Sequence, residues 1–232
     1  MRPLDNIIWH ALSSRQSQFA ACFDQARRFV PEVGPLAGFA KPTKRGYESL
    51  AGLLRVGTTV AVFLENPYEP RSGWVHAGGA PLLQMICDNG VSQHATEKPQ
   101  GLQFAELGNA DSPEMLELTG LTKPGPFSTR THELGTYLGI RVDGKLVAMT
   151  GERLKVPGFT EVSAVCTHPD HLGRGYAGAL MTEVMLRIRE RGETPCLHVR
   201  QDNVRAIELY KRLGFRERRV VHFALLRKDQ II

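Results

Sequence analysis

One continuous stretch, Glu161 to Leu180, constrains the fold of this chain more than any other, because it joins three kinds of local structure. Its first residues are apolar and β-branched up to Thr167, which indicates a buried strand. His168 and Pro169 end that run, and a turn with three glycines follows before a helical pattern begins. Free N–H groups at a helix start, next to glycines that let the backbone approach a ligand, favour an anion. The stretch therefore predicts a phosphate-binding strand–loop–helix unit.

Two common phosphate loops fit this stretch poorly. Gly173, Gly175 and Gly178 satisfy the dinucleotide pattern G-x-G-x-x-G. However, His168–Leu172 separate these glycines from the strand, and too little chain follows for the repeated βα units of that fold. A Walker A loop is excluded because no Lys-Ser or Lys-Thr pair follows the glycines.

Two motifs carry a family resemblance. Leu172 to Ala177 resembles motif A of the GNAT superfamily of acyl-CoA-dependent N-acyltransferases, [QR]-x-x-G-x-[GA]. Leu172 departs from the first position, which removes one side-chain contact but leaves the backbone amides. Asn203 to Phe215 resembles the second hallmark, N-x-x-A-x-x-[LF]-Y-x-x-x-G-F, at every named position. The motifs stand in the family's order and spacing, and the resemblance covers about residues 102–227.

The resemblance implies an α/β fold with a mixed central sheet flanked by helices. It also implies transfer of an acetyl group from acetyl-CoA, or of another acyl group from its acyl-CoA, to a primary amine by direct attack in a ternary complex. No metal is expected. The central strand would splay from its neighbour, with the Val165 N–H polarising the thioester carbonyl. The implied acyl-CoA contacts are Val165, Cys166, Thr167, Gly173, Arg174, Gly175, Tyr176, Ala177, Gly178, Asn203 and Tyr210.

Two residues are candidates for proton transfer. The resemblance makes Tyr210 the general acid toward the leaving thiolate, although its place on an apolar helical stripe equally fits a core aromatic residue. Glu161 is the candidate base, because it lies eleven positions before Leu172, as the glutamate of histone-type GNAT enzymes does. Burial at the start of the strand is expected to raise the carboxyl pKa, which suits a base. The alternatives for Glu161 are a solvated strand entrance or a base elsewhere, while His168 is expected to be a turn residue.

Three functional classes remain open. The first is an N-acetyltransferase acting on a small amine, an amino acid or a protein amine. The second is an acyltransferase that uses a longer or aromatic acyl-CoA, as in the glycine N-acyltransferase-like branch. The third is a non-catalytic acyl-CoA-binding module. The segments Gly120–Arg130 and Glu152–Gly158 are expected to be the loops at the acceptor, and a homodimer is compatible with all three classes.

Composition and charge limit the class of protein, the cellular compartment and the partners that the sequence predicts. The chain has 232 residues, of which 42% are hydrophobic and 23% charged, as in soluble globular proteins. No apolar run reaches the roughly 18 residues of a membrane span, and no secretion signal is recognisable, so a cytoplasmic protein is expected. The four cysteines form no C-x-x-C pair, which favours reduced thiols without zinc. The net charge of +5 is concentrated after the glycine turn, which suits polyanionic coenzyme A. No basic stripe alternates with aromatic residues, so a nucleic-acid partner is not expected.

The sequence divides near residue 100. Residues 1–100 are expected to form an N-terminal α/β subdomain of uncertain role, compatible with a degenerate GNAT-like repeat or with a cover for the substrate side. Residues 101–232 would form the GNAT domain, with the boundary in the polar stretch Asn89–Gly101. The elements expected before this boundary are helices over Phe19–Phe29 and Tyr47–Arg55, a strand over Thr58–Leu64, and one or two strands within Trp74–Ile86.

Local signals also predict the later elements. Ser112 is expected to cap a helix that has Pro113 in its first turn. Asp143-Gly144 between two apolar runs predicts a hairpin. The remaining expected elements are strands over Leu102–Leu107, Glu161–Thr167, Pro195–Val199 and Val220–Leu226, a helix from the glycine turn to Gly192, and a helix capped by Asn203.

Overall fold

The computed structural model describes residues 3–91 and 101–229, which form two sheets and five α-helices. The small sheet contains β1 (Ala20–Phe23), β2 (Ala26–Phe29) and β3 (Ala37–Phe39). The large sheet contains β4 (Thr59–Leu64), β5 (Trp74–Ile86), β6 (Ala105–Leu107), β7 (Tyr137–Val142), β8 (Lys145–Val156), β9 (Phe159–Thr167), β10 (Thr194–Arg200) and β11 (Arg216–Lys228). The helices are α1 (Ile7–Leu12), α2 (Lys44–Gly52), α3 (Ser112–Thr122), α4 (Tyr176–Glu190) and α5 (Val204–Arg212).

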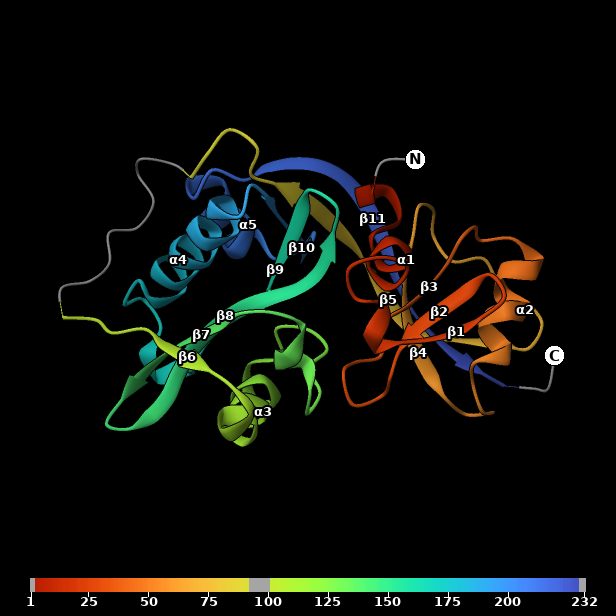
Figure 1. Cartoon of the computed structure of the whole chain (residues 1–232), viewed down its shortest axis with the longest axis horizontal. Helices are drawn as coiled ribbons and strands as arrows, with labels where there is room; N and C mark the ends of the chain where they lie inside the picture. Colours follow the sequence, from red (N-terminus) through yellow and green to blue (C-terminus); the bar gives the residue numbers. More distant parts are fainter. Residues whose placement is uncertain (1–2, 92–100, 230–232) are drawn as a thin grey trace.

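The large sheet has the strand order β4-β11-β5-β10-β9-β8-β7-β6 (Figure 1). Its neighbours pair antiparallel except β9 and β10, which run parallel. The predicted α/β class, with a mixed central sheet flanked by helices, is confirmed.

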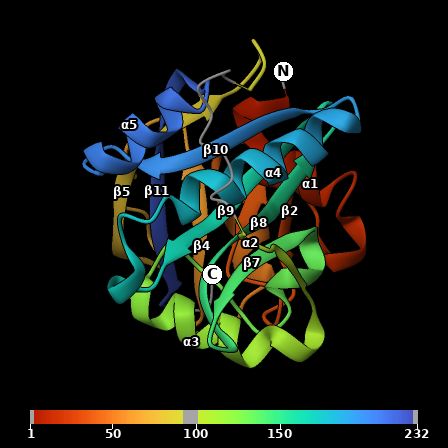
Figure 2. The ribbon, with the colours of Figure 1, turned by 90° about the vertical axis from the view of Figure 1, so that its left-hand side faces the viewer.

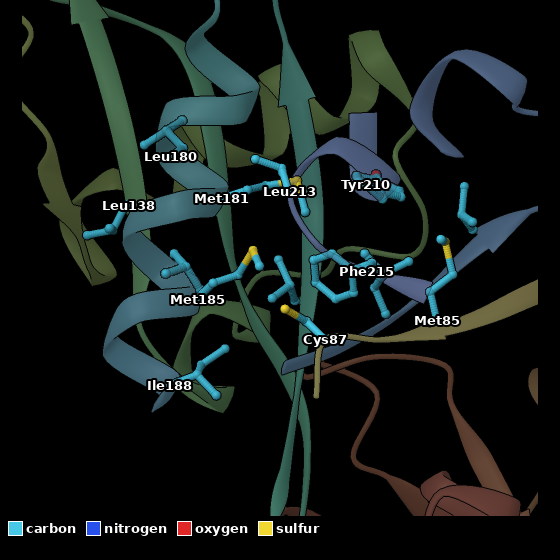
Figure 3. Packing of buried hydrophobic residues seen from close by; sticks show 14 of the residues in the cluster. Met85, Cys87, Leu138, Leu180, Met181, Met185, Ile188, Tyr210, Leu213 and Phe215 are labelled. Carbon is cyan, nitrogen blue, oxygen red and sulfur yellow. The ribbon is translucent and has the colours of Figure 1, made fainter. Parts of the chain in front are cut away.

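The two faces of the sheet carry different helices. Leu138 and Ala148 pack into the cluster that contains the apolar side of α4, whereas their neighbours Tyr137 and Met149 pack with α3. This alternation follows from the two-residue period of a strand. Figure 2 shows α4 and α5 lying across the strands on one face, and Figure 3 shows Met181 and Met185 of α4 near Leu213 and Phe215.

An N-terminal strand lies inside the large sheet. β5 pairs with β10 on one side and with β11 along nearly its whole length on the other. Leu83, Met85 and Cys87 therefore belong to the same buried cluster as α4. The boundary predicted near residue 100 divides the sequence but not the sheet. Within the predicted boundary stretch Asn89–Gly101, residues 92–100 lie outside the described residues.

The helix predicted over Phe19–Phe29 is wrong. This segment is the hairpin of β1 and β2, in which Ala20 faces Phe29 and Phe23 faces Ala26. Asp24 turns the chain with φ of +44°. Its carboxylate accepts hydrogen bonds from Arg45 at 2.9 and 3.0 Å and from Ser49 at 2.9 Å. Because these partners come from α2, local sequence does not reveal the turn.

Most of the other expected elements are confirmed, among them one strand within Trp74–Ile86, and the cap of α3 and the extent of β8 differ from the prediction. Asp143 and Gly144 have φ of +50° and +80°, the left-handed pair that a type I′ turn requires. Asp111, and not Ser112, occupies the N-cap position of α3, where it makes no side-chain capping bond, and the Ser112 hydroxyl donates to the Thr129 carbonyl at 2.7 Å. Glu152–Val156 belongs to β8, so the predicted loop Glu152–Gly158 is reduced to its last two residues.

All four cysteines lie in the described part of the chain, and none of them forms a disulfide. Cys22 is exposed, while Cys87, Cys166 and Cys196 are buried. Within residues 3–91 and 101–229, no group of three His, Cys, Asp or Glu side chains could hold a metal ion. No helix in the same residues is long and apolar enough to cross a membrane.

Candidate active site

The two parallel strands β9 and β10 separate partway along their length. Their paired positions end at Glu161 and Cys196, although β9 continues to Thr167 and β10 to Arg200. The predicted splay of the central strand is confirmed. From Val162 onward, no described residue pairs with the edge of β9 that faces β10, where backbone groups can pair with an extended ligand.

A β-bulge shapes the open part of β9. Ser163 faces Gly151 and Cys166 faces Met149, so Ala164 and Val165 together oppose the single residue Thr150. Ala164 has φ of +52°, a left-handed conformation that costs a residue with a Cβ atom about 1–2 kcal/mol. The Thr150 hydroxyl donates to the Ser163 carbonyl at 3.1 Å and ties the bulge to β8. Such bulges re-aim a side chain or end strand pairing, and they are frequent next to active sites.

The glycine loop forms one wall of a cleft of about 560 Å³. Gly173 and Gly175 have φ of +78° and +77°, and Gly175 is the N-cap of α4, with no side chain over the first-turn amides. All eleven residues predicted to contact acyl-CoA line this cleft: Val165, Cys166, Thr167, Gly173, Arg174, Gly175, Tyr176, Ala177, Gly178, Asn203 and Tyr210. The contact with acyl-CoA itself stays a prediction.

The charge of this cleft fits a polyanion. Arg174, Arg205 and Arg212 line it, and no aspartate or glutamate of the described residues does. Within residues 3–91 and 101–229, these three arginines form no ion pair. Together with the positive end of α4, they would attract a polyanion.

A second cavity of about 450 Å³ is lined both by residues next to the opening between β9 and β10 and by residues of the N-terminal part of the chain. The predicted acceptor loop Gly120–Arg130 begins only at Lys123, because α3 continues to Thr122. Thr122 and the loop residues Lys123–Pro126 line this cavity, and the first hundred residues contribute Leu36, Phe63, Gly79, Ala80 and Leu82. Val165, Asn203 and Tyr210 line both this cavity and the cleft beside the glycine loop. The two spaces therefore meet at these three residues.

Tyr210 is nearly buried at this junction, with 8% of its surface exposed. Burial raises the pKa of its phenol to about 12. The hydroxyl is therefore protonated at neutral pH and can donate. The ring also lies edge-on to Phe215, with centroids 6.1 Å apart, so Tyr210 is at once a core aromatic residue and a donor next to both cavities.

Glu161 differs from the sequence-based expectation. Its side chain is completely buried and accepts two hydrogen bonds from Arg153, at 2.9 Å from Nε and 2.8 Å from Nη2. His198 Nδ1 lies 2.7 Å from Oε1. Burial alone would raise the carboxyl pKa, but these partners outweigh it and lower the pKa to about 2. The predicted upward shift of this pKa is wrong.

Sequence reasoning missed Arg153 and His198, which both line the second cavity. An unbulged hairpin would place Leu154 opposite Glu161. A register shift between Glu152 and Lys155 instead brings Arg153 to it. The sequence does contain a signal for His198. This histidine is a polar residue within an apolar strand, so its side chain lies on the face opposite to that of its two neighbours. His168 is a turn residue as predicted, since its Nδ1 accepts from the Asp170 N–H at 3.3 Å.

Comparisons with known proteins agree on one family. Residues 137–224 match the family described as FR47-like protein. A structure described as an acetyltransferase of the GNAT family from Novosphingobium aromaticivorans shares 38% identity over 99% of this chain and 100% of that one, with a TM-score of 0.90. A GCN5-related N-acetyltransferase from Kribbella flavida has the same fold at 18% identity, with a TM-score of 0.61 over 96% of each chain.

A curated relative matches only locally. Sixty residues are 42% identical to the mycothiol acetyltransferase of Corynebacterium aurimucosum, which is 25% of this chain and 20% of that protein. The chain thus spans about a fifth of the length of that relative.

Proposed function

Because this chain belongs to the GNAT superfamily of acyl-CoA N-acyltransferases, we propose that it transfers the acetyl group of acetyl-CoA to a primary amine. The observation that supports this proposal most is the junction at Val165, Asn203 and Tyr210, which line both the cationic cleft and the second cavity. A donor in the first space and an acceptor in the second would meet there. Direct attack requires that the two substrates meet in this way, and no covalent enzyme intermediate is needed.

In this proposal, the neutral amine nitrogen attacks the thioester carbonyl carbon. The C–N bond forms, the C–S bond breaks, and the nitrogen loses one proton while the thiolate gains one. Val165 lies in the part of β9 that has no partner in β10, and its N–H would donate to the carbonyl oxygen as negative charge develops there. The Tyr210 hydroxyl would donate a hydrogen bond to the departing sulfur, and solvent would supply the proton that the thiolate gains.

Glu161 takes no proton in this scheme. Its pKa is lowered to about 2, so it remains ionised wherever an amine is reactive, and it does not line the second cavity. It would act through Arg153 and His198, which it holds in the cavity wall. The proton of the amine would pass to solvent, and Glu161 would be a positioning residue.

A thiol-release assay over a panel of primary amines tests the proposal. We expect release of coenzyme A from acetyl-CoA that depends on an amine. Coenzyme A at about 100 times its dissociation constant should also stabilise the fold by roughly 2.7 kcal/mol. Stabilisation without thiol release from any amine would make the chain a binding module, and preference for benzoyl-CoA would make it an aromatic acyltransferase.

A further inference from the structure

The acceptor cavity, defined as the second cavity described above, has cationic side chains in its wall and no anionic ones among the described residues. Lys123, Arg153 and Arg200 line it, and none of the described residues in its wall is an aspartate or glutamate. Glu161 and Asp202, which balance the charges of Arg153 and Arg200, lie outside this wall. An acceptor in the cavity therefore faces N–H donors and the Lys123 ammonium group, which favour an acceptor that carries negative charge.

Arg153 offers the best-formed anion contact in this wall. Arginine has five N–H donors, and Glu161 takes one on Nε and one on Nη2. Among residues 3–91 and 101–229, the other donors of Nη1 and Nη2 have no hydrogen-bond acceptor. These donors form the end edge of the guanidinium, a fork that matches both oxygens of a carboxylate.

The position of this free edge is fixed. Only 10% of the Arg153 side chain is exposed, and Glu161 holds it from behind. A Cβ atom built on Gly125 would lie 3.9 Å from Nη1, so the loop of the acceptor cavity runs alongside the free edge. A desolvated, preorganised fork binds a carboxylate more strongly than an exposed arginine does.

His198 does not compete for this role. Arg218 donates to Gln84 Oε1 at 2.5 Å, which turns the Gln84 Nε2 donors toward Leu4 and His198. Gln84 Nε2 lies 2.9 Å from His198 Nε2, so that nitrogen accepts while Nδ1 donates to Glu161. Both ring nitrogens are occupied, and the histidine presents its ring to the cavity.

One side of the cavity wall is apolar. Phe63 lies against His198, with ring centroids 4.7 Å apart, and edge-on to Phe223 at 6.2 Å. Leu36, Leu82 and Leu225 complete this side. The wall suits a branched or aromatic group.

We propose, on the basis of the proposed N-acyl transfer, that the acceptor is a primary amine bearing a carboxylate and an apolar body, as an apolar α-amino acid does. The carboxylate binds the free edge of Arg153, and the apolar body packs on Phe63 and Phe223. The amine then points toward the junction at Val165. Arg153 is the specificity-determining residue.

Matched acceptors test this proposal by thiol release with acetyl-CoA. L-phenylalanine is compared with phenethylamine, and L-leucine with 3-methylbutylamine. We expect kcat/KM to be at least tenfold higher for each amino acid. Arg153→Lys keeps the charge beside Glu161 but lacks the fork, and should reduce that ratio at least tenfold. The control Arg200→Lys should keep the ratio, because Arg200 is exposed and its fork already holds Asp202.

A binding measurement separates this proposal from the proposed function. In the presence of coenzyme A, 3-phenylpropanoate should bind the wild type at least tenfold more tightly than it binds Arg153→Lys, and 2-phenylethanol should show no such difference. If Arg153→Lys does not fold, the double variant Arg153→Gln, Glu161→Gln removes both buried charges and takes its place. Equal kcat/KM within each matched pair, or a preference for a polyamine, would overturn the carboxylate proposal and leave N-acyl transfer standing. Binding of 3-phenylpropanoate without thiol release from any amine would support the anion site and overturn the proposed function.

Discussion

The Arg153 guanidinium holds the Glu161 carboxylate through two parallel hydrogen bonds, 2.9 Å from Nε to Oε2 and 2.8 Å from Nη2 to Oε1. This pair is buried behind the acceptor cavity and lowers the pKa of Glu161 to about 2. A carboxylate in this state cannot take a proton from an ammonium group near neutral pH. The acid limb of the rate profile should then belong to the acceptor amine, which must lose its own proton before it attacks.

Glu161→Gln tests this assignment through the pH dependence of kcat/KM. We expect the acid limb to keep its position in the variant and to move when the acceptor is replaced by an amine of different pKa. Steady-state rates between pH 6 and 10 with two acceptors provide the measurement. If the acid limb disappears in Glu161→Gln, Glu161 is the general base after all.

The same substitution should destabilise the protein in a pH-dependent way. The Glu161 pKa is about 2 in the folded state against an ordinary 4.5, so its contribution is fully present above pH 4.5. It is lost as the pH falls from 4.5 to 2. At pH 7, removing one partner of a buried pair costs about 3–5 kcal/mol, because Arg153 keeps an unbalanced charge. Urea unfolding of both proteins at pH 7 and pH 3 measures this, and an equal difference at both pH values would contradict it.

Sequence reasoning succeeded where one local element carries its own signal. Asp143-Gly144 encodes its turn through backbone conformation, and Asn203 caps α5 by accepting from the Ala206 N–H at 3.2 Å. Gly173 and Gly175 predicted the loop beside the cleft in the same way, because glycine readily adopts the positive φ values that both residues have.

Sequence reasoning failed where a local structure or a pKa depends on a residue that is distant in the sequence. The turn at Asp24 depends on Arg45, and the pKa of Glu161 depends on a bulge that brings Arg153 opposite to it. The place of β5 between β10 and β11 is a further case, since a strand pattern specifies the strand but not its neighbours.

Gly175→Asp and Gly175→Asn form a matched pair for the phosphate site. Both side chains tolerate the left-handed conformation of Gly175, where φ is +77°, and they differ only in charge. We expect the dissociation constant of coenzyme A to be more than tenfold higher for Asp than for Asn. Asp at a helix start is itself favourable, so its melting temperature should not fall below that of Asn. Equal affinity in the two variants would show that the phosphates of coenzyme A bind elsewhere.

Residues 101–232 should not fold alone, although both recognisable motifs lie within them. This fragment lacks β5 and the residue that follows it, which removes Leu83, Met85 and Cys87 from the cluster around α4. Burial of a leucine or methionine side chain contributes about 1.5–3 kcal/mol, so the loss approaches the net stability of a domain. Circular dichroism and urea unfolding of the fragment should show no cooperative transition, and co-expression with residues 1–100 should restore one. Cooperative unfolding of the fragment alone would make it an independent domain.

Tyr210→Phe should impair chemistry more than binding. Phenylalanine keeps the ring that packs against Phe215, so the fold and the affinity for acetyl-CoA should hold, and only the hydroxyl at the junction is lost. The pKa of Tyr210 is about 12, whereas a simple thiol titrates near 8.5, so complete proton transfer to the thiolate is uphill by about 3.5 pKa units. The hydroxyl would then act mainly by donating a hydrogen bond as charge develops on sulfur. For that reason we expect kcat to fall by about 100-fold, the low end for an acid catalyst. Steady-state kinetics beside a binding isotherm for acetyl-CoA give the measurement, and wild-type kcat in the variant would leave Tyr210 as a packing residue.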